Sequence, residues 1–577
     1  MSTIDVRLWS LACATWVGSL LAFELPPIVL LAVALGVGLL RRPWAVAIIA
    51  LVLSAQVASW VIEDLAPVAS QDFSGLVTLS TDPEPIGSAL RADADSPLGR
   101  VQLRARGRAA DDLRLLLAGD RVVLSGAVSP RSDDSDWLLQ RKVVGLLTVN
   151  RVDGHTPAGG VNGLANSLRQ TLERGAESLG PERLSLFTGL VVGDDRWQSP
   201  QTADDFRGSG LGHLLAVSGQ NVAFVLLILA PLARWLPPGV RVVVMLGVLG
   251  FFALVTRFEP SVLRASVMAG LAVVSVTVGR PGSGLRLLGM AVVGLLWWDP
   301  LLGRSVGFQL SLLASLGILL VSPLVVDRLA GPRWFRELAA ATVGAQVAVA
   351  PLLLWVFDDV PVAALPANVL AGPASGPVMA WGLTGGLLAG LLGGRAAVLL
   401  HTPTGWLLGW IAGVAGWASS VGWGSYGWRH VVAAALVLGV TAVFRVRVVR
   451  LWAGVLGVFV LLAPLFVGGS APGVVVGDGV SVWRSGEVTV VELGDGAGAE
   501  RSLALLRSLR LDVVDLLVID GASAQTVESV VGRYGPGRVA DVSDPAELRN
   551  QYRLGDLWVR FASSSRGVQV LVDRRAE

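Results

Sequence analysis

Apolar runs of near-membrane length recur along most of this chain and constrain its fold more than any other feature. A helix needs about 20 apolar residues to cross the hydrocarbon core of a bilayer. Runs of about this size lie near residues 8–23, 28–40 and 44–61 and recur from 211 to 468, which predicts about 13 spans. Because 53% of the 577 residues are hydrophobic and only 16% are charged, the fold class predicted is a polytopic α-helical membrane protein.

Two stretches are far less apolar and are predicted to lie outside the membrane. Residues 63–158 hold short alternating runs between Pro and Gly turns, typical of a small β-barrel or sandwich. These runs lie at 74–79, 100–108, 120–127 and 143–149. Residues 469–577 combine the apolar strand patterns VTVVEL and VVDLLVI with helical patterns, typical of an α/β domain.

The chain is therefore predicted to have five parts. They are N-terminal transmembrane helices (1–62), an external β domain (63–158), interfacial helices (159–207), a transmembrane domain (208–468) and an external C-terminal domain (469–577). In the interfacial part, leucines recur at helical spacing beside charged residues, which predicts an amphipathic helix on the membrane surface: Leu164, Leu168, Leu172 and Leu179. Pro181 and Pro200 each open a further helix, the second capped by Ser199.

The loops between the predicted spans alternate in charge, and this alternation predicts the topology. Arg41 and Arg42 follow the second run, and arginines such as Arg234 and Arg241 recur on the same side, whereas Glu259 and Asp299 fall on the other. Basic loops stay in the cytoplasm. The N-terminus is therefore predicted to be cytoplasmic, and residues 62–207 and 469–577 to be external.

The segment 208–225, GSGLGHLLAVSGQNVAFV, places four polar side chains where an apolar run enters the membrane. They are His213, Ser218, Gln220 and Asn221. Desolvating such groups costs free energy unless each finds a partner or a wet cavity. Ser, Asn and Gln also bond neighbouring helices, so packing is the alternative. Their density between glycines favours a functional site over packing alone.

Further polar residues lie inside the predicted spans, at Arg264, Gln309, Gln346 and Asn368. The three amides each fit a packing role. Arg264 differs, because a cation near the apolar centre is costly and an anion pathway is a natural use for it; the alternative is a position at the outer membrane edge. The run 362–393 is interrupted by prolines and glycines between 366 and 377, which predicts broken helices against protein or a water-filled path.

Three arginines in VQLRARGR predict a possible contact with DNA in the β domain. Arg104, Arg106 and Arg108 alternate, so they are expected on one strand face, where guanidinium groups can bind phosphate. Residues 63–155 carry 11 basic and 14 acidic residues, however. A solvated strand face is therefore the open alternative.

Five blocks, taken in order, resemble the membrane domain of ComEC-type competence channels. They are GLVVGDDR (189–196), SGLGHLLAVSGQNV (209–222), PSVLRASVMAG (260–270), DPLLGRSVGFQLSLLASLGILL (299–320) and QVAVAPLLLWVFDDVPVAALPANVLAGP (346–373). The phrases GDRVVLSG and DDSDWLLQRKVVG resemble the external OB-like domain of that family. This chain has Gln220 and Asn221 where the family usually has an aliphatic residue or histidine.

The resemblance implies a channel that carries single-stranded DNA across the cytoplasmic membrane of a bacterium during natural transformation. It also implies an external DNA receptor and a cytoplasmic helicase-like motor as partners, since the sequence has no P-loop for ATP hydrolysis. Transport of another solute is the runner-up, for which the interrupted run 362–393 is equally good evidence. The oligomeric state is left open.

The C-terminal part resembles a truncated, degenerate metallo-β-lactamase-like domain. In that family a His-x-His-x-Asp-His loop holds two metals, but the loop here reads IDGASAQTVESVV. The four histidines of the chain are His155, His213, His401 and His430, all before this domain. Asp478, Asp495 and Asp520 would form at most a weak hard-cation site. We therefore expect no metal, no cofactor and no catalytic residue, which disfavours a membrane-tethered nuclease.

Overall fold

The computed structural model describes residues 3–22, 43–436 and 473–574, apart from short gaps at 87–88, 133–135, 422, 434–435, 478, 486–487, 510, 512, 545–546, 548–549, 555–556 and 565–566. The predicted spans at 28–40 and 451–468, most of the span at 431–444, and Asp478 lie outside the described residues. Two compact units account for the chain. Unit 1 comprises Met1–Trp197, His213–Val356 and Asn368–Ile411, and unit 2 comprises Gln198–Gly212, Phe357–Ala367 and Ala412–Glu577.

Helices dominate the membrane part, as predicted. Seven helices within the described ranges are long and apolar enough to cross a membrane, which confirms a polytopic helical membrane protein. The membrane part also contains shorter helices, and its helices in chain order are α1 (Thr3–Leu21), α3 (Pro43–Asp64), α9 (Gly219–Ala233), α10 (Pro238–Val255), α11 (Pro260–Thr277), α12 (Gly284–Trp298), α13 (Val306–Leu320), α14 (Ser322–Val326), α15 (Arg333–Phe357), α16 (Ala364–Trp381), α17 (Leu387–Leu392) and α18 (Gly394–Ser420).

The prediction of broken helices between residues 366 and 377 is wrong. Helix α16 continues through Pro373 and Pro377, and the irregular segment comes later, as a π-helical turn at Gly382–Gly386. Glycine after this turn lets a second helix approach closely: a Cβ atom on Gly390 would lie 1.9 Å from the carbonyl oxygen of Thr171. Thr171 belongs to α6 (Gly160–Ala176), so the small residues serve helix packing here.

The helices between the β domain and the membrane part begin where the prolines predict. Helix α7 (Pro181–Val192) and helix α8 (Pro200–Gly208) each start at a proline, and Ser199 caps α8 by accepting from the backbone N–H of Thr202. In α6 the buried face includes Arg169 as well as Leu172, whereas Leu164 is exposed. The placement of α6 on a membrane surface stays a prediction.

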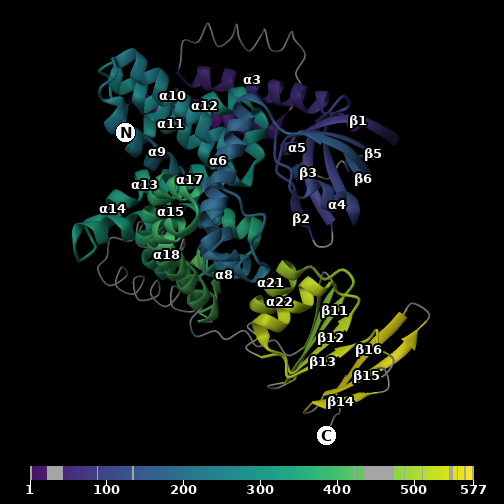
Figure 1. Ribbon diagram of the computed structural model, residues 1–577. Helices are drawn as coiled ribbons and strands as arrows, with labels where there is room; N and C mark the ends of the chain where they lie inside the picture. The colour runs from purple at the N-terminus through teal and green to yellow at the C-terminus, as the bar shows by residue number, and fades with distance from the viewer. Residues whose placement is uncertain are drawn as a thin grey trace. The chain divides into compact units, whose positions relative to one another are not determined.

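The β domain contains one mixed sheet (Figure 1). Its strands are β1 (Gln71–Leu79), β2 (Glu84–Ile86), β3 (Ala89–Ser96), β4 (Gly99–Arg106), β5 (Arg121–Pro130) and β6 (Val143–Thr156). The order is β1-β5-β6-β4-β3-β2, and β1 also pairs with β3. Strands β4 and β6 are parallel, and the other pairs are antiparallel.

Each of the four runs that the sequence predicts as strands in the β domain forms a strand, although the run at 100–108 does so only as far as Arg106. Strand β3 is not predicted, because ALRADADS is rich in Ala and Asp, which are depleted in strands. Its pairing with β4 along its whole length, from Ala89 opposite Arg106 to Ser96 opposite Gly99, overrides that preference. Leu90, Ala92 and Ala94 face the buried core.

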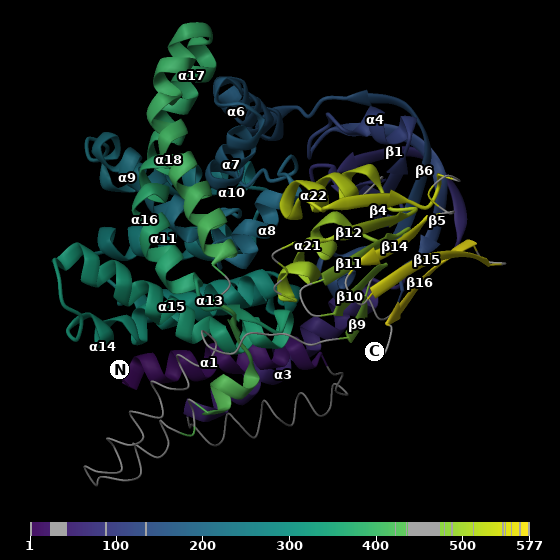
Figure 2. The same ribbon diagram turned by 90° about the horizontal axis from the view of Figure 1, so that it is seen from below.

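The C-terminal domain has the predicted strand-helix-strand pattern. Strands β9 (Gly473–Gly477), β10 (Val480–Ser485), β11 (Val488–Gly494), β12 (Leu516–Asp520) and β13 (Arg538–Asp541) form a five-stranded sheet in the order β13-β12-β11-β10-β9. Helices α21 (Ala499–Ser508) and α22 (Ala524–Tyr534) cover one face (Figures 1 and 2). A three-stranded sheet of β14 (Gln551–Leu554), β15 (Leu557–Ser564) and β16 (Gly567–Arg574) packs on the other.

Candidate functional site

The polar stretch at residues 213–221 leads into helix α9, and its four predicted site residues fall into two environments. Asn221 is fully buried; its Nδ2 donates to the carbonyl oxygen of Leu190 (2.8 Å), and its Oδ1 accepts from Ser218 Oγ (3.2 Å). Ser218 also caps α9, because its Oγ accepts from the backbone N–H of Gln220. These contacts fasten the start of α9 to the end of α7, as the packing interpretation requires.

His213 and Gln220 are exposed instead. His213 lies in a short 3-10 turn, Gly212–Leu214. Gln220 lies beside α16, since a Cβ atom on Gly376 would come within 3.7 Å of its Nε2. Of the four residues, these two remain accessible to a passing molecule, and their role on a channel path stays a prediction.

Arg264 on α11 is buried, with 7% of the residue exposed. Its Nε donates to Ser311 Oγ on α13 (2.9 Å), and its Nη1 contacts Met268 Sδ (3.2 Å). A Cβ atom on Gly219, the first residue of α9, would lie 3.2 Å from Arg264 Nη2. The guanidinium group therefore lies where α9, α11 and α13 meet.

No carboxylate within the described ranges forms an ion pair with Arg264. Burying a charge is costly unless an opposite charge accompanies it, and a membrane span makes that cost larger. Guanidinium offers five donors, and a hydroxyl and a thioether satisfy only two of its nitrogens here. Among the residues that the structure describes, the site thus contains no anion, and it has donors to bind one.

The predicted site residues with amide side chains differ in their hydrogen bonding and burial. Gln309 Nε2 donates to the carbonyl oxygen of Gly303 (2.8 Å), which is a packing contact. Asn368 lies half-buried on α16. In Gln346 on α15, the buried Oε1 atom has no hydrogen-bond partner within the part of the chain that the structure describes, so it retains an unused acceptor.

A buried network of charged side chains fixes the β domain to the helices of unit 1, and the sequence did not predict it. Arg169 on α6 is its centre: Nη2 contacts Asp82 Oδ2 (3.0 Å) and Asp194 Oδ2 (2.9 Å). Its Nη1 donates to the carbonyl oxygens of Val192 (3.0 Å) and Val255 (2.8 Å). One arginine thus joins the β1–β2 turn to the ends of α7 and α10.

Two further arginines complete the network. Arg257 binds Asp82 through two hydrogen bonds (2.9 and 2.7 Å) and donates to Asn166 Oδ1 (2.8 Å). Arg196 binds Asp194 in the same bidentate way (2.7 and 2.7 Å). Burial opposes ionisation of Asp82, but Arg169 and Arg257 outweigh it and hold the pKa of that carboxyl well below its usual range. The block GLVVGDDR supplied the only sequence signal, because it contains Asp194 and Arg196.

Of the three arginines predicted on one strand face of the β domain, two lie on that face and one does not. Arg104 and Arg106 are exposed on β4, but the strand ends at Arg106. Arg108 begins helix α4 (Arg108–Leu113) after Gly107, which has a φ of 54°. The prediction that Arg108 shares this face is therefore wrong, because the left-handed glycine turns the chain out of the sheet.

The strands beside β4 bring further charged side chains close to Arg104 and Arg106, and the sequence did not predict this grouping. Arg91 on β3 lies directly opposite Arg104. With Glu84 of β2 and Arg141 after α5, this face of β3 and β4 gathers five arginines against three carboxylates: Arg91, Arg100, Arg104, Arg106 and Arg141 against Glu84, Asp93 and Asp95. The face is therefore positive, although the segment as a whole is negative.

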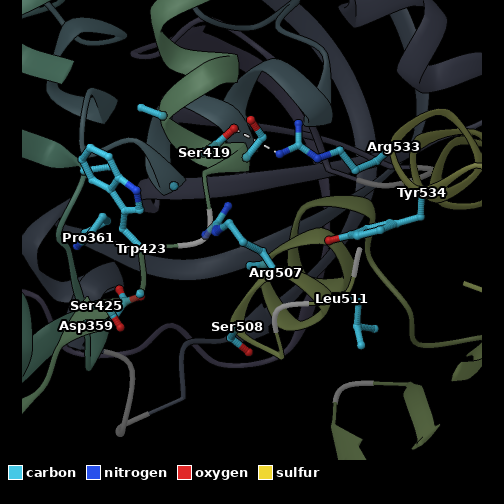
Figure 3. Close-up of a pocket in the computed structure, with 16 residues that line it drawn as sticks. Asp359, Pro361, Ser419, Trp423, Ser425, Arg507, Ser508, Leu511, Arg533 and Tyr534 are labelled. Carbon is cyan, nitrogen blue, oxygen red and sulfur yellow. Dashed lines mark hydrogen bonds between the residues drawn. The ribbon is translucent and has the colours of Figure 1, made fainter. Parts of the chain in front are cut away.

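In unit 2, a cavity of about 270 Å³ lies at the ends of helices α21 and α22 (Figure 3). Arg507, Trp423 and Tyr534 surround it. Arg507 forms an ion pair with Asp204 of α8 and also donates to its carbonyl oxygen (2.8 Å). Burial raises the pKa of Tyr534 to about 12.

A second ion pair lies beside the first. Arg533 pairs with Asp205, and its Nη2 donates to Ser419 Oγ (3.1 Å). Basic residues suit the last turn of a helix, where the backbone carbonyls are partially negative. These contacts dock α21 and α22 on α8, which runs directly into the polar stretch.

Asp495, which follows β11, lies close to Gly521, which follows β12. A Cβ atom on Gly521, next to Asp520, would be 3.4 Å from the Cβ of Asp495. Within the described residues, no three His, Cys, Asp or Glu side chains form a group that could hold a metal ion. The expectation that this domain binds no metal stays a prediction.

Comparison with known proteins bears on the helical part of the chain. Residues 190–468 match the family model described as "Competence protein". ComE operon protein 3 of Bacillus subtilis (strain 168) is 25% identical over 201 residues, which are 34% of this chain and 25% of that protein. The aligned part thus spans a quarter of the length of this relative. No solved structure matches.

Proposed function

Because this chain belongs to the ComEC-type competence family, we propose that it forms the passage through which one strand of DNA crosses the cytoplasmic membrane. The environment of Arg264 carries the proposal. Its guanidinium is buried in a membrane helix, has no carboxylate partner within the described ranges and lies beside the glycine that starts α9. A DNA phosphate would supply the missing negative charge and could accept two parallel hydrogen bonds.

The β domain is proposed to be the external OB-like domain that receives the strand. Its strand order supports this, because β1 pairs with β3 as well as β5, β4 runs parallel to β6, and α4 lies between β4 and β5. OB-folds are five-stranded Greek-key barrels that bind oligonucleotides on one strand face. The positive outward face of β3 and β4 suits a phosphate backbone.

The C-terminal domain is proposed to be a degenerate metallo-β-lactamase-like domain without catalytic activity. Its α21–α22 face binds α8 through two ion pairs, which suits docking. We further propose that the N-terminus is cytoplasmic, that the β and C-terminal domains are external, and that a DNA receptor and a helicase-like motor are the partners. The basic loops support this orientation.

Uptake of labelled DNA tests the channel. In a strain that lacks the gene, externally bound DNA is expected to persist while entry stops, and the wild-type protein restores entry. Arg264→Gln is expected to lower entry at least about tenfold, and Arg264→Lys less, because lysine retains the charge. A matched control is Arg286→Gln, whose arginine pairs with Asp5 within the protein.

The outcomes separate the hypotheses. If Arg264→Gln and Arg264→Lys fail equally while the protein remains inserted, Arg264 has a structural role. If deletion leaves DNA entry unchanged, the channel proposal is wrong, and transport of another solute replaces it.

A further inference from the structure

A short segment between β5 and β6, Asp136–Lys142, bridges the β domain and the membrane part of unit 1. We call it the bridge segment; it contains helix α5 (Asp136–Gln140) (Figure 1). Gln140 Nε2 donates to the carbonyl oxygen of Arg304 (2.8 Å), and Lys142 Nζ pairs with Asp299 (2.9 Å). Asp299 directly precedes the 3-10 helix Pro300–Arg304, and Arg304 is its last residue. This short helix leads into α13.

Two arginines lie within cation–π distance of Trp137 on the bridge segment. The guanidinium of Arg91 lies 5.4 Å from the centre of a Trp137 ring, and that of Arg141 lies 5.8 Å away. Carboxylates fix both cations: Arg91 pairs with Glu84 (2.8 Å) and Arg141 with Asp93 (2.6 Å). The indole ring is thus held in place by cation–π contacts, yet 42% of the residue is exposed.

The ring lies at one end of a row of positive charge. Arg91 lies directly opposite Arg104 on the adjacent strand, and Arg106 follows on the same face. Like charges directly opposite each other destabilise a sheet. Arg104 and Arg106 are exposed, and no carboxylate in the described ranges forms an ion pair with either. An anion along this row would relieve the repulsion.

We infer that Trp137 stacks on an unpaired base of a DNA strand whose phosphates lie along Arg104 and Arg106. This inference rests on the proposed function, and it names the residue that would hold the strand at the boundary with the membrane part. An exposed aromatic ring beside a basic row is the combination that binds single strands without sequence preference. Duplex DNA fits poorly, because its bases are stacked on one another and leave no free face for the ring.

Binding of a fluorescent oligo-dT by the full-length protein in nanodiscs tests the inference. Stacking of one base is worth about 1–3 kcal/mol, so Trp137→Ala is expected to weaken binding about 5- to 150-fold. Trp137→Phe retains an aromatic face and is expected to stay within about threefold of wild type. A duplex of the same length is expected to respond to neither change.

The matched control is Trp558→Ala. Trp558 is also a tryptophan on a sheet beside an arginine, Arg553, at 5.6 Å, but it belongs to the C-terminal domain. Its removal is expected to leave binding unchanged. As a second measurement that needs no variant, photocrosslinking of oligonucleotides with halogenated uracil is expected to label Trp137 in the wild-type protein.

The outcomes distinguish a failure of the proposed function from a failure of the inference about Trp137. If the wild-type protein binds no single strand at all, the proposed function fails and the inference with it. If the wild type binds but Trp137→Ala binds equally well, or the crosslink maps elsewhere, only the inference is overturned. If Trp137→Ala does not fold, the crosslink decides: labelling of Trp137 supports the inference, and labelling at another site overturns it.

Discussion

At the scale of single residues, side chains that look alike in the sequence differ in their burial and in their hydrogen-bond or ion-pair partners. Asn221 and Gln220 are neighbours, but Asn221 is fully buried with both amide atoms bonded, whereas Gln220 is exposed. Arg169 and Arg264 are both buried arginines, but Arg169 binds two carboxylates and Arg264 binds none among the described residues. The same residue type therefore serves as a structural centre in one place and as a candidate anion site in the other.

The charged network around Arg169 predicts a pH-dependent contribution to stability. Asp82→Asn is expected to destabilise the protein by about 3–5 kcal/mol near neutral pH, because it leaves Arg169 and Arg257 underpaired. The folded-state pKa of Asp82 lies below its unfolded-state value of about 3.9. Its stabilisation is therefore present above that pH and is lost as the pH falls toward the folded-state pKa.

Thermal unfolding of the solubilised protein between pH 3 and pH 8 measures this effect. Asp82→Asn should lower the melting temperature most near neutral pH, with a smaller difference in acid. Asp72→Asn, an exposed carboxylate in the same domain, serves as the control and should change little. An equal drop in melting temperature for both variants would show that the charged network makes no specific contribution to stability.

At the scale of elements, ion pairs and close packing decide which helices associate. Helix α8 is short, yet Arg507 and Arg533 from α21 and α22 reach its consecutive carboxylates Asp204 and Asp205. Asp204 is only 2% exposed, so the pair with Arg507 is largely shielded from water. A buried pair that loses one partner leaves an uncompensated charge.

Arg507→Ala is therefore expected to loosen the contact between α21 and α8. Amide hydrogen exchange in residues 200–208 should rise at least about tenfold, because breaking a buried pair costs about 3–5 kcal/mol. Arg538→Ala, on the exposed strand β13, removes the same side chain without touching α8. Unchanged exchange with Arg507→Ala would contradict a docking role for this ion pair.

At the scale of the whole molecule, the C-terminal domain retains two cores without the histidines of a metal centre. One core lies between the five-stranded sheet and its helices, and the other lies between the two sheets. Burial of these apolar side chains stabilises the domain. Its charge of 12 basic and 15 acidic residues in 470–577 does not favour bulk capture of DNA.

The full-length protein is therefore expected to cut neither single- nor double-stranded DNA with Mg²⁺, Mn²⁺ or Zn²⁺. Gel assays of labelled oligonucleotides measure this, and Asp495→Ala and Asp520→Ala should behave as wild type. Two-metal cleavage needs several nitrogen and carboxylate ligands at close range. Metal-dependent cleavage that disappears with Asp520→Ala would establish a nuclease and refute the prediction.

Local patterns account for much of this protein. The apolar runs predicted membrane helices because a bilayer requires a set length, and Pro200 with Ser199 predicted the start of α8 because helix ends have local rules. Alternation predicted β1, β4, β5 and β6 because successive side chains face opposite sides of a strand. The exposed positions of Arg104 and Arg106 follow from the same rule.

Pairings between residues far apart in the chain come from the tertiary fold alone. The bonds from Arg169 to Asp82, and from Asn221 to Leu190, bring distant segments together, and no local pattern specifies such a partner. Strand β3 forms because β4 pairs with it, and α16 continues through its prolines although its local sequence predicts a break. The arginines around Trp137 come from β3 and the bridge segment, which only the fold places together. Burial and pairing depend on what surrounds a side chain, and those surroundings exist only in the folded chain.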